Sequence, residues 1–128
     1  MSKLQIFIDV NFPRKVVDLL EELHRLQKEQ KFSIIRWENQ NITEAEYSSS
    51  IVLLMDQETR GLSIPVKKHH EEGMRVIVCK KKKKAKLDRF ELALTLFRVW
   101  PSIVDKAKEK SSPFIYKFNY GGRRLTAV

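Results

Sequence analysis

A chain of 128 residues is long enough for one hydrophobic core and short for two, so we expect a single domain spanning residues 1–128. Its apolar share of 42% indicates a globular protein, while the lack of a long apolar run and of a signal-peptide pattern favours a cytoplasmic protein with no membrane association. The net charge of +9 favours a polyanionic partner, with nucleic acid first, an acidic protein second and an anionic membrane last. The oligomeric state stays open, and a homodimer is among the alternatives.

The chain begins with an apolar run that ends on a carboxylate. Leu4 to Ile8 is nearly continuous in apolar residues, which is typical of a parallel strand covered on both faces. Asp9 and Asn11 follow at its carboxyl end, where ligands bind in open α/β sheets. The alternative is that Asp9 caps the next helix, whose first turn would take Pro13.

The next segments predict a right-handed βαβ unit followed by a polar connection. Residues 13–30 carry apolar side chains at helical spacing, and residues 32–37 form a second candidate strand. In the polar stretch that follows, Thr43 is placed to cap one helical turn that carries Glu44 and Glu46.

A second strand then repeats the opening pattern. Residues 51–55 are apolar and lead directly to Asp56. If this strand lies parallel and next to the first, Asp9 and Asp56 meet at one edge of the sheet. The alternative for Asp56 is again a loop cap. A helix over residues 65–72 follows, and its adjacent histidines, His69 and His70, point about 100° apart and are read as surface residues.

A run of lysines follows the next predicted strand, residues 74–79. The strand ends on the lone Cys79, which is read as a packing residue rather than a nucleophile and suits a reducing compartment. The lysines should lie at the same sheet edge as the acids, where they could hold a nucleic-acid backbone without reading its sequence. A solvated loop is the other interpretation. The run comprises Lys80, Lys81, Lys82, Lys83, Lys84 and Lys86.

The last third of the chain predicts a long helix and a hairpin. Residues 87–108 read as a helix with Phe90, Leu94, Phe97 and Trp100 on one face, kinked or interrupted at Pro101. Trp37 and Trp100 fit a core better than a surface for stacking bases. The tail, residues 114–128, predicts a β-hairpin that turns at Gly121-Gly122. The element order predicts a three-layer α/β/α domain with a mainly parallel sheet.

The acids define the candidate chemistry. Carboxylates gathered at a sheet edge repel one another, and Mg²⁺ or Mn²⁺ is the usual ion that stabilises such a group. Asp9 and Asp56 are the expected ligands and Asn11 a neutral helper. The candidate third acid is Glu44, which lies nearer the proposed cap at Thr43, and Glu46 is its alternative or a supporting residue. The sequence has no GxGxxG, P-loop or GxSxG motif to indicate a nucleotide cofactor or a serine hydrolase.

Three segments resemble PIN-like domains, the fold of VapC-type ribonuclease toxins. IFIDVNFPRKVVDLLEEL resembles their Asp-x-Asn-x-Pro start, and IVLLMDQETRG resembles their second acidic strand. The stretch FELALTLFRVWPSIVDKAKEKSSPFIYKF is similar to the C-terminal part of a PIN-like subgroup in which a helix, Trp-Pro and a Pro-Phe strand recur. The resemblance covers nearly the whole chain in matching order.

This resemblance implies a metal-dependent endoribonuclease, including the toxin of a toxin–antitoxin pair, with Asp9 and Asp56 as metal ligands and catalytic residues. Family members carry further acids on a helix ahead of the second acidic strand, whereas this chain has only the short segment ITEAEYSSS. The rival hypothesis is therefore a PIN-like module that binds RNA or an acidic protein without cutting. A phosphoacceptor domain ranks last, because the first strand offers Asp9 alone.

Overall fold

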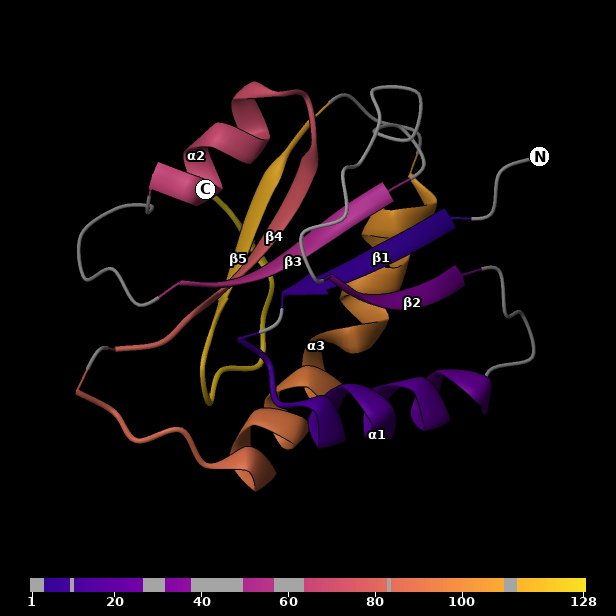
Figure 1. Cartoon of the computed structure of the whole chain (residues 1–128), viewed down its shortest axis with the longest axis vertical. Helices are drawn as coiled ribbons and strands as arrows, with labels where there is room; N and C mark the ends of the chain where they lie inside the picture. The colour runs from indigo at the N-terminus through magenta and orange to yellow at the C-terminus, as the bar shows by residue number, and fades with distance from the viewer. Residues whose placement is uncertain are drawn as a thin grey trace.

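Strands and helices alternate along the chain in a computed structural model, which describes residues 4–9, 11–26, 32–37, 50–56, 64–82, 84–109 and 113–128 (Figure 1). The elements are β1 (Leu4–Asp9), α1 (Arg14–Arg25), β2 (Phe32–Trp37), β3 (Ser50–Asp56), α2 (Ile64–Glu71), β4 (Arg75–Lys80), α3 (Arg89–Lys108), β5 (Ile115–Asn119) and β6 (Thr126–Ala127). No helix in these ranges is both long and apolar enough to cross a lipid bilayer.

The strands form one six-stranded sheet in the order β2-β1-β3-β4-β5-β6. The first five run parallel, and β6 pairs antiparallel with β5, which confirms the α/β fold, the mainly parallel sheet and the C-terminal antiparallel pair. Gly121 takes a φ of 80° in the turn before β6, and a Cβ on Gly122 would lie 2.9 Å from the carbonyl oxygen of Asn119. Gly121 therefore supplies a backbone conformation that other residues rarely adopt, and Gly122 leaves room for the carbonyl of Asn119.

The two faces of the sheet carry separate apolar clusters. The first face packs against α1 and α3, which lie together on one side of the sheet in Figure 1. Its buried strand residues are Ile6, Ile8, Ile51, Leu53, Ile77, Cys79 and Phe118. The second face carries Phe7, Val52, Leu54, Val76 and Val78, with Trp37 packed against them. Helix α2 lies away from α1 and α3 and contacts β4.

The two helical connections over the first face have opposite hands. The connection β1-α1-β2 and the connection β4-α3-β5 both join parallel strands and both pack on this face. They step in opposite directions along the sheet, because β2 and β5 lie on opposite sides of β1, β3 and β4. The usual right-handed crossover rule therefore holds for only one of them.

Helix α1 buries one stripe against the sheet and α3. Val16, Val17 and Leu20 are buried, as its apolar spacing predicts, whereas Leu19 lies on the exposed side. His24 is also buried, and its ring meets Trp100 edge-on with the ring centroids 6.0 Å apart. Burial lowers the pKa of His24, which favours the uncharged imidazole in the interface between α1 and α3.

Helix α3 runs through Pro101 as one element, and its buried face differs in part from the predicted one. Trp100 is buried, which confirms that it is a core residue. Phe90, expected on the same face, is 73% exposed. The core stripe passes through Leu92 and Leu96, and Phe90 lies two residues from Leu92, which is about 200° around the helix. The prediction that Phe90 shares one face with the buried Trp100 is therefore wrong.

Candidate active site

Asp9 holds the turn between β1 and α1. One carboxylate oxygen, Oδ1, accepts the backbone N–H of Asn11 at 3.2 Å. The other, Oδ2, accepts the Asn11 side-chain amide at 3.2 Å and the backbone N–H of Met55 at 3.5 Å. The N-cap of α1 is Pro13, with no side-chain cap hydrogen bond, so Asp9 is not the cap of that helix. Its carboxylate instead links the end of β1 to β3.

Asp56 ends β3 as a buried carboxylate beside an ammonium group. Its side chain is only 2% exposed, and its Oδ2 lies 3.3 Å from Nζ of Lys80. The two residues are register partners at the ends of β3 and β4, and Lys81 donates its backbone N–H to the Asp56 carbonyl at 3.0 Å. A buried carboxylate is costly without a compensating charge. Lys80 supplies one.

The two aspartates and Lys80 lie on the same side of the sheet. Phe7, Leu54 and Val78 belong to the second face. Asp9, Asp56 and Lys80 follow them, in that order, by two positions each. Side chains alternate along a strand, so the three groups occupy that face at the carboxyl ends of β1, β3 and β4. The strand order reverses between β1 and β3, and such a switch point is where open α/β sheets bind ligands.

This edge carries two carboxylates on the same face of the sheet. The carboxylates of Asp9 and Asp56 suit Mg²⁺ or Mn²⁺, which keep several waters among their ligands. The Lys80 ammonium already lies beside Asp56, 3.3 Å from its Oδ2. Within the described ranges, no three His, Cys, Asp or Glu side chains are grouped to hold a metal. Glu44 and Glu46, the candidate third acids, lie outside those ranges.

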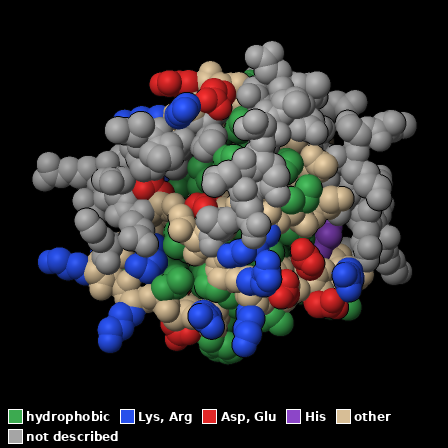
Figure 2. Space-filling view, in the orientation of Figure 1, with side chains coloured by type: hydrophobic (Ala, Val, Ile, Leu, Met, Phe, Trp, Pro, Cys, Tyr) green, Lys and Arg blue, Asp and Glu red, His purple; other side chains and the backbone are tan. Residues whose placement is uncertain are grey.

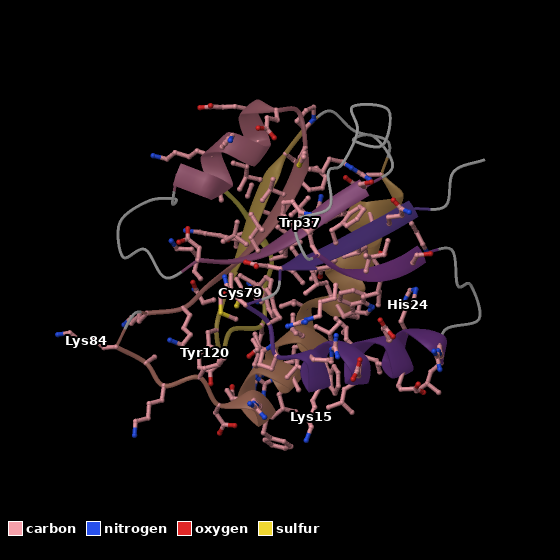
Figure 3. The ribbon with its side chains drawn as sticks, in the orientation of Figure 1. Lys15, His24, Trp37, Cys79, Lys84 and Tyr120 are labelled. Atoms are coloured by element: carbon pink, nitrogen blue, oxygen red, sulfur yellow. The ribbon has the colours of Figure 1, made fainter. Side chains whose placement is uncertain are left out.

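The lysine run divides into groups with different surroundings. Lys80 pairs with Asp56, and Lys81 is buried with its ammonium donating to the carbonyl of Lys82 at 3.2 Å. Lys81 is thus turned away from solvent. Lys82, Lys84 and Lys86 are exposed, and Figure 3 shows Lys84 pointing away from the sheet. Lys83 lies outside the described residues.

Further exposed cations flank these lysines. Arg89 begins α3, directly after the lysine loop, while Arg123 and Arg124 follow the turn at the carboxyl end of β5. We call Lys82, Lys84, Lys86, Arg89, Arg123 and Arg124 the basic edge. In Figure 2, Lys and Arg side chains gather at the lower left, over the loop that Figure 1 draws between β4 and α3. The sequence indicated part of this group, since Arg123 and Arg124 directly follow the predicted turn at Gly121-Gly122.

The cysteine and the histidines of α2 lie outside the candidate site. Cys79 is buried in the first face, where burial raises the pKa of its thiol to about 12. The thiol is therefore protonated at neutral pH and is not a nucleophile. His70 is half-buried on α2, and the side chain of His69 lies outside the described part of the structure.

The fold and this edge define an α/β domain with a charged switch point between β1 and β3. The chain matches no family model, no curated protein and no solved structure at a significant level. The resemblance to PIN-like domains therefore rests only on the three sequence segments described above.

Proposed function

We propose that this chain is a three-layer PIN-like domain that cleaves RNA with the help of Mg²⁺ or Mn²⁺. The observation that carries the proposal is the placement of Asp9 and Asp56 on one sheet face, at the carboxyl ends of the adjacent parallel strands β1 and β3. Further support comes from the basic edge, which begins two residues after Lys80 and suits a polyanionic substrate.

The residues of this site have distinct roles in the proposal. Asp9 and Asp56 would hold the ion, and Glu44 or Glu46 would complete the acid set. Asn11 positions Asp9 through its two hydrogen bonds. A bound Mg²⁺ or Mn²⁺ would supply the Lewis acid for phosphodiester hydrolysis. If the chain is the toxin of a toxin–antitoxin pair, an acidic antitoxin would complement the basic edge.

A second candidate is a module of the same fold that binds RNA or an acidic protein without cutting. The ion pair between Lys80 and Asp56 favours it, because the ammonium already offsets the charge of the buried carboxylate. The two candidates predict different outcomes when RNA is offered together with a metal.

The test is cleavage of a labelled single-stranded RNA in the presence of Mn²⁺. We expect wild type to cut and both Asp9→Asn and Asp56→Asn to lose at least roughly 100-fold in rate, since each removes a ligand charge. Asp18→Asn, on the exposed side of α1, is the matched control and should retain full activity. Wild type that binds this RNA but leaves it intact with Mn²⁺ would support the non-cutting module instead.

A further inference from the structure

Phe90 is an exposed aromatic side chain in the first turn of α3. It is 73% exposed, and it is the one aromatic among the large apolar residues that stand open to solvent in the described ranges. Its backbone N–H donates to the Asp88 carboxylate at 2.8 Å, which is the N-cap interaction of α3. An aromatic ring left in water forgoes the free energy of burial, so a ligand with an apolar face can gain by covering Phe90.

The surroundings of Phe90 are positively charged. Lys86 and Arg89 precede it along the chain, and both are exposed. The two nearby acids already have partners, since Asp88 caps α3 and Glu91 lies 3.6 Å from Arg98. The partner of this surface should therefore carry negative charge together with flat apolar groups.

The turn after β5 is fastened to the same region. The Tyr120 hydroxyl accepts the backbone N–H of Asp88 at 2.9 Å, and Thr95 Oγ1 accepts the N–H of Gly121 at 3.0 Å. The Tyr120 backbone N–H donates to the Lys80 carbonyl at 2.9 Å. These bonds connect the start of α3, the turn that leads to Arg123, and the end of β4 beside Asp56. Phe90 and the candidate active site thus belong to one continuous structural unit.

We infer that Phe90 is a stacking platform for one nucleobase of a single-stranded RNA whose phosphates bind Lys82, Lys84, Lys86 and Arg89. This inference rests on the proposed function and adds a positioning residue to it. An unpaired base offers its flat face to an aromatic ring, whereas the bases of a duplex are already stacked. The cations alone would suit any polyanion, and the exposed ring is what favours nucleic acid over an acidic protein.

The experiment measures binding of a fluorescein-labelled single-stranded RNA in EDTA, so that cleavage cannot interfere. We expect Phe90→Ala to weaken binding roughly 5- to 150-fold, the range for loss of one stacked base, and to leave the salt dependence unchanged. Phe90→Trp should retain affinity. Lys86→Gln should instead reduce the salt dependence, by about one counterion. Leu19→Ala, which removes another exposed apolar side chain on α1, should have no effect.

Binding of duplex RNA and of poly-glutamate is measured in the same way for comparison. We expect Phe90→Ala to leave binding of both unchanged. If Phe90→Ala binds single-stranded RNA as wild type does, or weakens poly-glutamate binding equally, the stacking role is wrong. Normal Mn²⁺-dependent cleavage by that variant would then show that the proposed function stands without it. Failure of wild type to bind any RNA would overturn both.

Discussion

Replacing Arg75 with methionine should lower the free energy of unfolding by roughly 2–4 kcal/mol, because buried carbonyl groups lose a charged donor. Arg75 is 1% exposed at the start of β4. Its Nε donates to the carbonyl of Ser50 at 3.2 Å, and its Nη1 donates to those of Ala107 and Glu109 at 3.3 and 3.0 Å. One guanidinium thus joins β3, β4 and the end of α3. Burial lowers the pKa of Arg75, because it disfavours the charged guanidinium. The hydrogen bonds to these carbonyls offset that effect.

Chemical denaturation measures this effect. Arg98→Met is the matched control, because Arg98 is partly exposed and lies 3.6 Å from Glu91, and we expect a change below about 1 kcal/mol. Arg75→Lys should recover only part of the loss, since one ammonium cannot reach all the carbonyls that the planar guanidinium spans. An Arg75→Met protein as stable as the Arg98→Met protein would show that the buried guanidinium does not hold these elements together.

Replacing Lys80 with methionine should destabilise the metal-free protein by roughly 3–5 kcal/mol, the usual cost of removing one partner from a buried ion pair. The change removes the ammonium that lies 3.3 Å from the Asp56 carboxylate, whose side chain is 2% exposed. If Asp56 is a metal ligand, Mn²⁺ can then supply the missing positive charge. We therefore expect Mn²⁺ to raise the melting temperature of Lys80→Met by more than it raises that of wild type.

The control for this prediction is Lys82→Met, which removes an exposed lysine two positions further along the chain. Its stability and its response to Mn²⁺ should match those of wild type. Thermal unfolding at several Mn²⁺ concentrations gives both quantities. An Lys80→Met protein that is destabilised but gains nothing from Mn²⁺ would mean that Asp56 serves only as the partner of Lys80.

Much of the fold could be predicted because the buried strands consist of nearly continuous runs of apolar residues. The runs that end at Asp9 and Asp56 gave β1 and β3, and the adjacency of those strands follows from the sheet order. The stripe of α3 was harder to predict, because apolar residues lie nearly all around this helix. Phe90 and Leu92 could each have faced the core, and only the packing of α1 against α3 decides between them.

The site was less predictable, because its contacts depend on register and on tertiary burial. The pairing of Lys80 with Asp56 requires that β3 and β4 be aligned residue by residue, which no local pattern specifies. Lys81 looks like its neighbours in sequence, yet its side chain is buried. Arg75 lies within a predicted apolar strand, and its burial depends on the end of α3, which brings carbonyl groups to it.

The most direct test of a metal site shared by Asp9 and Asp56 is calorimetric titration of the wild-type protein with Mn²⁺, with Asp9→Asn and Asp56→Asn alongside it. Asparagine keeps the shape of each side chain and, at Asp9, an oxygen that can still accept the N–H of Asn11. We expect wild type to bind Mn²⁺ and both variants to lose that binding while remaining folded. No binding by wild type at millimolar Mn²⁺, or undiminished binding by either variant, would contradict a shared site.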